Sequence, residues 1–328
     1  EKVVAQGFDC ADVTQIPQSE CEALVAFYYA TGGDEWWSGG GWLVTNTPCE
    51  WDGITCEAGH VTGLEKGDLV GSIAVELANL SQLRLLSIGA NSNLSGVIPP
   101  ELGTLSQLET FTLYHNYELS IPPELGNLSA LRELRITTDF GPAEPGDQSD
   151  LHARHGGAVI PPELGNLSAL ETLVISRSVG GTIPPELGNL SNLQVLDLSE
   201  NGPLTGSIPP ELGNLPNLIA LDLSRSLVSC QVPGPGPLSG PLPPELGNLT
   251  NLQYLNLYCQ SFSGPIPMSF INLLDLQYFN FWTWGDNYLC EPPDPAFQQW
   301  INGVPEVNST GILCEPSSQQ LYLPLVAR

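Results

Sequence analysis

The chain has 328 residues, with nine Lys and Arg against 36 Asp and Glu, and a formal net charge of -27 at pH 7. Such a surface repels nucleic-acid phosphates and anionic membranes, which excludes both as partners. No apolar run reaches the ~18 residues needed to cross a bilayer. The sequence starts at Glu1 without a recognisable signal peptide, so we expect a mature, processed form.

The first 60 residues are expected to form an N-terminal cap. The segment 21–30 is apolar with a helical period, which predicts a short helix that ends at Thr31 and Gly32. Four tryptophans follow it, at positions 36, 37, 42 and 51. Bulky indoles can cover the apolar end of a stacked structure, and that is the interpretation we favour over a sugar-binding role.

Residues 61–284 are built from one repeated unit. The octamer Ile-Pro-Pro-Glu-Leu-Gly-Asn-Leu, or a close variant, occurs at 98–105, 121–128, 160–167, 183–190, 208–215 and 242–249. The pattern Leu-x-x-Leu-x-Leu begins at residues 83, 108, 131, 170, 193, 218, 252 and 276, with spacings of 25, 23, 39, 23, 25, 34 and 24. A period of roughly 20–29 with this leucine pattern is typical of leucine-rich repeats.

The step Leu-(Ser/Thr)-Gly-x-Ile-Pro also recurs, at 94–99 and 204–209, and with it the unit resembles the plant-type leucine-rich-repeat family. The resemblance implies a leucine-rich-repeat solenoid of the α/β horseshoe class. Residues 61–82 are a degenerate first repeat. The Trp-rich segment that ends at 49–56 is similar to that family's N-terminal cap.

Within each repeat, Leu-x-x-Leu-x-Leu predicts a short strand of a parallel, concave sheet. Its second and third leucines point inward, and the residues between them point outward. The Pro-containing half should return along the convex side as 3₁₀ or irregular turns, because Pro blocks strand pairing. The ninth repeat position is Asn at 91, 116 and 201, but Asp139, Ser178, Ser226, Gln260 and Trp284 replace it elsewhere, so we expect local irregularity at those repeats.

Two insertions, 140–158 and 227–237, interrupt the repeats with polar, Gly- and Pro-rich sequence. Loops that interrupt a regular scaffold often carry function, although drift in a tolerant loop is equally compatible with the sequence. In the first insertion His152 and His155 lie near Asp147 and Asp150. Two histidines in such a loop are a weak metal signal, and we predict neither a metal nor a cofactor.

Eight cysteines form four pairs of sequence neighbours, which predicts the disulfides Cys10–Cys21, Cys49–Cys56, Cys230–Cys259 and Cys290–Cys314. Disulfides at the ends of a solenoid indicate a secreted or cell-surface protein. Residues 285–314 are expected to form a C-terminal cap around Trp300. A linker and an apolar tail, residues 315–328, complete the chain.

The outward positions of the strands suggest a binding surface. Towards the C-terminal end they gather four aromatic residues beside two asparagines, namely Tyr254, Tyr258, Tyr278, Trp282, Asn256 and Asn280. Exposed aromatic clusters are common at partner sites, which makes these six residues our candidate site. The alternative is that the C-terminal cap or the 227–237 insertion covers them.

The octamer also places one Glu per repeat on the convex side, at 101, 124, 163, 186, 211 and 245. Neighbouring carboxylates would be about one strand spacing apart, ~4.8 Å. A solvated face is the simpler interpretation, and a cation-binding stripe is the alternative.

The four histidines, at 60, 115, 152 and 155, have no spacing that indicates a Ser-His-Asp or similar catalytic arrangement, so no enzymatic activity is expected. The resemblance to receptor ectodomains and to polygalacturonase-inhibitor-like proteins implies an extracellular module that binds a protein or carbohydrate on its concave face. The alternative is a structural subunit of a surface coat, fibre or adhesive matrix. Such a subunit would associate with other copies of itself through the apolar tail, residues 321–328, whereas in an isolated chain we expect the tail to fold back on its own C-terminal cap.

Overall fold

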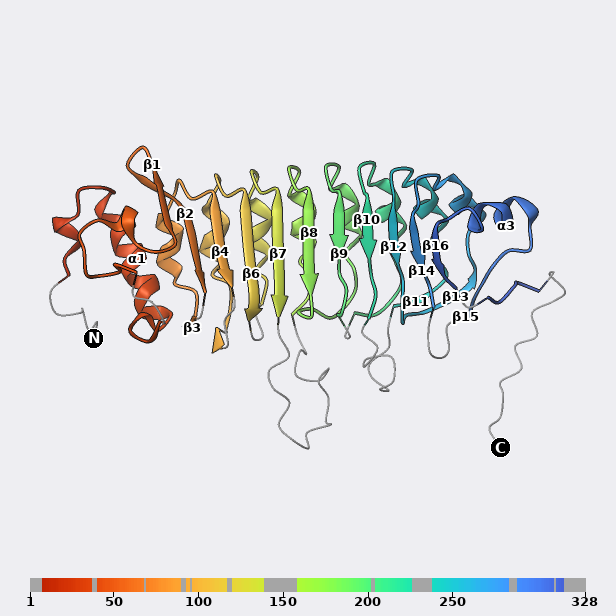
Figure 1. Ribbon diagram of the computed structural model, residues 1–328, viewed down its shortest axis with the longest axis horizontal. Helices are drawn as coiled ribbons and strands as arrows, with labels where there is room; N and C mark the ends of the chain where they lie inside the picture. Colours follow the sequence, from red (N-terminus) through yellow and green to blue (C-terminus); the bar gives the residue numbers. More distant parts are fainter. Residues whose placement is uncertain are drawn as a thin grey trace, which may run out of the picture.

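A computed structural model shows an elongated solenoid whose strands follow one another in chain order (Figure 1). It describes residues 8–36, 40–67, 69–89, 93–94, 96–116, 120–138, 158–201, 204–225, 238–282, 288–309 and 311–315. Both predicted insertions lie almost wholly outside these ranges, as does the tail.

One eleven-stranded sheet forms the concave side of the solenoid. Its strands, in spatial order, are β1 (Ile54–Glu57), β2 (His60–Gly67), β4 (Leu85–Gly89), β6 (Thr110–Asn116), β7 (Glu133–Thr138), β8 (Thr172–Ser176), β9 (Val195–Asp197), β10 (Ala220–Asp222), β12 (Tyr254–Asn256), β14 (Tyr278–Asn280) and β16 (Glu306–Asn308). Only the first pair is antiparallel, and every later pair is parallel. Equivalent repeat positions therefore lie side by side across the sheet.

The predicted inward and outward alternation of the strands is confirmed. Leu196, Leu221 and Leu255 are in register on neighbouring strands and are fully buried. The positions that flank them, such as Val195 and Asp197, are half-buried and face the concave side. Each repeat thus buries its leucines against the two adjacent repeats and extends one continuous core.

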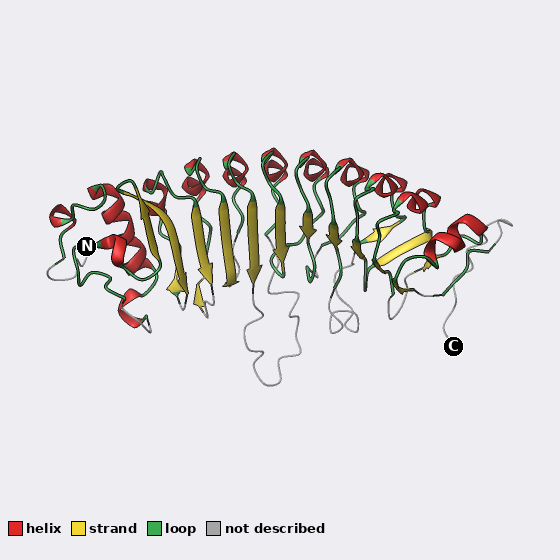
Figure 2. Ribbon diagram, turned by 45° about the horizontal axis from the view of Figure 1, so that its top comes forward, coloured by secondary structure: helices red, strands yellow, loops and turns green. Residues whose placement is uncertain are grey.

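The convex side consists of short 3₁₀ helices, as the prolines predict (Figure 2). They comprise Val75–Asn79, Pro100–Thr104, Pro123–Asn127, Pro162–Asn166, Pro185–Asn189, Pro210–Asn214, Pro244–Asn248 and Met268–Asn272. In the six that belong to the octamer, its glycine permits a close approach between repeats. A Cβ added at Gly188, for example, would lie 2.3 Å from the carbonyl oxygen of Glu211.

Between strand and 3₁₀ helix, segments in or next to the Gly-x-Ile-Pro step form further parallel pairs that the sequence did not predict, and one strand of the C-terminal segment joins them. One three-stranded sheet contains β11 (Ser239–Gly240), β13 (Ser261–Pro265) and β15 (Tyr288–Cys290), and a two-stranded one contains β3 (Val70–Gly71) and β5 (Asn93–Leu94). The step's glycine needs backbone angles that other residues rarely adopt, as at Gly206 with φ 84°.

Helix α1 (Gln18–Ala30) covers the N-terminal end of the solenoid, and its position confirms the predicted helix. Short 3₁₀ turns flank it at Cys10–Asp12, Gly33–Glu35 and Pro48–Glu50. Trp42 and Trp51 are each only 2% exposed, so they pack as the cap interpretation requires. The predicted bonds Cys10–Cys21 and Cys49–Cys56 are present.

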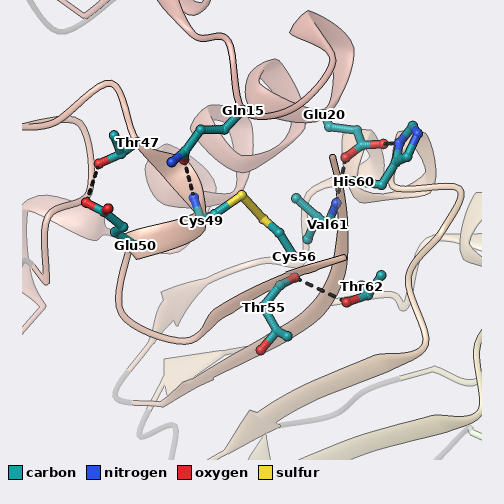
Figure 3. The surroundings of a disulfide bond; sticks show 10 residues. All are labelled: Gln15, Glu20, Thr47, Cys49, Glu50, Thr55, Cys56, His60, Val61 and Thr62. Atoms are coloured by element: carbon teal, nitrogen blue, oxygen red, sulfur yellow. Dashed lines mark hydrogen bonds and ion pairs between the residues drawn. A yellow bond between two sulfur atoms is a disulfide. The ribbon is translucent and has the colours of Figure 1, made fainter. Parts of the chain in front are cut away.

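The Cys49–Cys56 bond lies near a polar contact between α1 and β2 (Figure 3). The buried Glu20 carboxylate lies 2.7 Å from Nδ1 of His60 and accepts a 2.8 Å hydrogen bond from the backbone N–H of Val61. A buried carboxylate requires such partners, and here they fix the helix to the first long strand.

At the other end, α3 (Pro295–Ile301) starts at Asp294, whose carboxylate accepts from the N–H groups of Ala296 and Phe297. Trp300 packs on three phenylalanine rings, at positions 270, 279 and 297. The predicted Cys290–Cys314 bond is present. The sequence did not predict that this end would add β16 to the main sheet.

The ninth repeat position forms the same kind of buried contact with Asn at 201 and with Gln at 260. Asn201 accepts from the N–H groups of Ser178 and Val179 in the previous repeat and donates to the carbonyl of Ile175 there. Gln260 makes an equivalent pair of contacts, accepting from the N–H of Leu238 and donating to the carbonyl of Leu223. The irregularity predicted at position 260 is therefore wrong, because the longer amide restores the same interaction.

Candidate functional site

The four predicted aromatic residues lie together on the concave face near its C-terminal end. Tyr254 is in register with Tyr278 on β14, and the parallel pairing continues so that Tyr258 stacks beside Trp282. All four side chains are half-buried. They form what we call the aromatic platform: Tyr254, Tyr258, Tyr278 and Trp282.

The platform consists of two stacked pairs. The rings of Tyr254 and Tyr278 have centroids 4.6 Å apart and an interplanar angle of 6°. Those of Tyr258 and Trp282 are 5.9 Å apart at 13°. Ladders of this kind arise because parallel strands place equal residues one strand spacing apart.

The two predicted asparagines hold the rings in place from the row between them. The amide of Asn256 donates to the hydroxyl of Tyr254 at 3.0 Å, and its oxygen accepts the backbone N–H of Tyr258 at 3.3 Å. Asn280 repeats this arrangement with Tyr278 and Trp282 at 3.0 and 3.2 Å. Each asparagine is 9% exposed, so its role is to position the rings rather than to present a free amide.

Asp222 extends this network onto β10. Its Oδ2 accepts from Tyr254 and Asn256 at 3.2 and 3.1 Å, and its Oδ1 accepts from the N–H and the hydroxyl of Ser224 at 2.9 and 2.5 Å. Burial raises the pKa of Asp222 above its ordinary value of 3.8, against the lowering effect of the Ser224 hydrogen bonds. Burial, with the nearby Asp222 charge, also raises the pKa of Tyr254, whose phenol stays protonated.

The sequence places Asp197 and Asp222 in the same outward row as the two asparagines, but the candidate site omitted them. The two carboxylates are in register on β9 and β10. Their position in that row could have identified them from the sequence. The hydrogen bond that the Tyr254 hydroxyl donates to Asp222 could not be predicted from the sequence.

Beside the platform, on β9 and β10, the side chains on the concave face are small. Ala220 and Val195 occupy the row of Tyr254, and Ser224 and Ser199 occupy the row of Tyr258. The aromatic rings therefore rise as a step above the small side chains of β9 and β10.

Arg225 follows β10 at the edge of this region. Its backbone N–H donates to the carbonyl of Tyr258 at 3.0 Å, while its side chain is buried, which lowers the pKa of the guanidinium. Within the described part of the chain its Nε and Nη2 atoms have no hydrogen-bond partner. The nearby Glu200 carboxylate partly offsets the cost of burying this charge.

Other predicted features are placed as follows. Cys259 is disulfide-bonded, but its predicted partner Cys230 lies outside the described residues, as do His152 and His155. The six octamer glutamates are exposed on the convex side. Among the described residues, no group of three or more His, Cys, Asp or Glu is arranged to hold a metal ion, and no helix is long and apolar enough to cross a membrane.

Comparison with known proteins agrees with this architecture. The family described as Leucine Rich Repeat matches residues 192–215 and 251–273. The receptor-like kinase TMK4 of Arabidopsis thaliana is 39% identical over 77 residues, which cover 23% of this chain and 8% of that protein. The chain thus spans only a small part of the length of such relatives.

Among solved structures, the ectodomain of the Arabidopsis thaliana receptor kinase GASSHO1/SCHENGEN3, in complex with CASPARIAN STRIP INTEGRITY FACTOR 2, has a TM-score of 0.63 at 27% identity. The match covers 88% of this chain and 34% of that one. The plant peptide hormone receptor RGFR1, in complex with RGF2, has a TM-score of 0.57 at 29% identity, covering 74% of this chain and 42% of that one.

The repeated fold, its parallel sheet and its 3₁₀ turns define a leucine-rich-repeat solenoid. Within that class the chain is similar to plant leucine-rich-repeat receptor ectodomains, as the Leu-(Ser/Thr)-Gly-x-Ile-Pro step implies.

Proposed function

We propose that the protein is an extracellular, non-enzymatic recognition module that binds a peptide segment of a partner on its concave face through the aromatic platform. The observation that carries this proposal is the two stacked pairs of rings, half-buried and fixed by Asn256 and Asn280. Pre-positioned aromatic side chains bury a large area at low entropic cost on binding.

The similarity to the ectodomain of a plant peptide hormone receptor supports a peptide over a carbohydrate. The disulfides support an oxidising, extracellular location. A leucine-rich-repeat scaffold does not by itself define a function, so the proposal rests on the platform rather than on the fold.

The test starts with binding screens on arrays of synthetic peptides and of glycans. For the best binder, the double substitution Tyr258→Ala and Trp282→Ala should weaken binding at least ~100-fold, because two central aromatic contacts are lost. A matched control, Tyr29→Ala with Leu274→Ala, removes exposed hydrophobic side chains distant from the platform and should leave affinity unchanged.

Circular dichroism and thermal melting are used to check that both double variants remain folded. Undiminished binding by the Tyr258→Ala, Trp282→Ala protein would place the partner elsewhere. Native mass measurement addresses the structural alternative, since a recognition module should stay monomeric at the concentrations at which it binds.

A further inference from the structure

One ring face of the aromatic platform is left open by the architecture of the sheet. Tyr278 covers the face of Tyr254 that is turned towards β14. On the opposite side the register partner of Tyr254 is Ala220, whose methyl group covers little of a phenol ring. Among the described residues no second ring stacks there.

Two carboxylates lie beside this open face. Asp222 is two residues after Ala220 and therefore on the same side of β10, and Asp197 is its register partner on β9. Both oxygens of Asp222 accept hydrogen bonds from within the network. Asp197 accepts only the backbone N–H of Ser199, through Oδ1, among the interactions of the described chain, so its Oδ2 can receive a donor from a ligand.

The charge on this part of the concave face is one-sided. From β8 to β16 the outward positions contain Asp197, Asp222 and Glu306 and no Lys or Arg. Two arginines, Arg177 and Arg225, come after the ends of their strands; Arg177 is half-buried and Arg225 is only 6% exposed. Further along the sheet towards the N-terminus, Arg135 pairs with Glu133 on its own strand.

An aromatic face next to carboxylates selects for a cation. The π-face attracts ammonium and guanidinium groups, and a planar guanidinium can stack on the ring while it donates to a carboxylate. The total charge of -27 adds a long-range field that draws cationic partners to the surface. A neutral glycan could stack on the same ring but would gain nothing from this field.

We infer that the concave face binds a cationic peptide segment, with an Arg or Lys side chain over the open face of Tyr254 and its charged head group at Asp197 and Asp222. This inference rests on the proposed function and specifies the chemistry of the partner. It identifies Asp197 as a contact residue and Asp222 as the residue that fixes both the Tyr254 hydroxyl and the local charge.

The probes are two short synthetic peptides of equal length, one of alternating Arg and Ser and one of alternating Gln and Ser. The Arg peptide should bind more tightly, and amide NMR shifts should concentrate on β9, β10 and β12. Asp197→Asn should weaken its binding about fivefold, as expected for loss of one partly exposed ion pair. Tyr254→Leu, which keeps apolar bulk but removes the ring face, should also weaken it about fivefold.

The matched control is Glu186→Gln, which makes the same change in net charge on the exposed convex side and should leave affinity unchanged. Equal weakening by Glu186→Gln and Asp197→Asn, or shifts spread over the convex glutamates, would show general charge attraction and overturn the inference. Binding of a neutral cello-oligosaccharide at Tyr254 without binding of the Arg peptide would also overturn it.

The proposed function is tested independently of the cationic inference. It is rejected if an array-selected binder survives the Tyr258→Ala, Trp282→Ala change. It stands if that binder is lost but proves to be neutral or acidic, and in that case only the cationic inference is wrong.

Discussion

At the scale of single residues, Asp222 is the most consequential side chain of the concave face. It lies at the boundary between the low floor of β10 and the aromatic platform, and four hydrogen bonds converge on its carboxylate. Burial nevertheless raises the pKa of Asp222, so desolvation, together with the charge of Asp197, outweighs these hydrogen bonds. Ionised Asp222 thus favours the unfolded chain, and protonated Asp222 favours the fold.

The sign of the pH dependence follows from this. Because the folded-state pKa exceeds 3.8, the native protein holds more protons than the unfolded chain between the two pKa values. The contribution of Asp222 to stability is therefore complete below the unfolded value and is lost as the pH rises through the folded value.

Ser224→Ala tests this assignment. Loss of the serine hydroxyl removes a donor to the carboxylate, so the pKa of Asp222 should rise further and the protein should be ~1–2 kcal/mol less stable at pH 7. The pKa is followed by carboxyl ¹³C NMR and the stability by urea unfolding. Ser199→Ala at the equivalent position of β9 should leave the pKa of Asp222 unchanged, and an unshifted pKa in Ser224→Ala would contradict the assignment.

Individual contacts were the part of the site that sequence reasoning predicted least. The repeat register is encoded in the leucines, so it correctly placed Tyr254 beside Tyr278 and Asn256 beside Asn280. The hydrogen bonds of Asp222 depend on rotamers and on burial, which periodicity does not encode. The same holds for Gln260, whose extra methylene lets it perform the role of the family's asparagine.

At the scale of elements, the close contact between successive 3₁₀ helices determines how the convex side packs. The octamer glycine is buried against the next repeat's glutamate backbone at Gly103, Gly126, Gly165, Gly188 and Gly213, each with an added Cβ 2.3 Å from a carbonyl oxygen. Such a distance is well inside van der Waals contact, so any larger residue must separate two repeats.

Gly188→Ala should therefore destabilise the protein by ~1–3 kcal/mol, the usual cost of overpacking. Urea unfolding monitored by circular dichroism measures it. Asn189→Ala, one residue along on the exposed side of the same 3₁₀ helix, should cost clearly less. If both variants were equally stable, the repeats would be able to separate without penalty and the close-packing argument would be wrong.

Elements inside the repeats were predictable because each one repeats the same local pattern and contacts only its neighbours. The strands at the C-terminal end of the solenoid could not be predicted in this way. β16 has no leucine pattern of its own, and it joins the sheet because β14 offers an unpaired edge and α3 directs the chain back to it. The β11–β13–β15 sheet was missed because its strands are short and carry no leucine pattern of the Leu-x-x-Leu-x-Leu kind.

At the scale of the whole molecule, the dominant physical property is the charge of -27 on an elongated surface. The octamer repeats this charge as a column of exposed glutamates, one for each octamer, on the convex side. In water, two carboxylates more than ~4 Å apart repel by under ~1 kcal/mol, and salt reduces the repulsion because the Debye length falls from ~30 Å at 0.01 M to ~8 Å at 0.15 M. The fold should therefore be more stable at physiological ionic strength than at low salt.

The triple substitution Glu163→Gln, Glu186→Gln, Glu211→Gln tests whether the column causes this dependence. It removes three adjacent charges, so it should raise the melting temperature at low salt and reduce the further gain on adding sodium chloride. A control with the same net charge, Asp12→Asn, Glu57→Gln, Glu315→Gln, changes exposed carboxylates outside the column and should have the smaller effect. Equal effects of the two triple variants would mean that only total charge matters.

The same proteins test whether the column binds cations. If the column is only solvated, calcium chloride and sodium chloride at matched ionic strength should raise the melting temperature equally. A larger rise with calcium that disappears in the convex triple variant would instead support the cation-binding stripe.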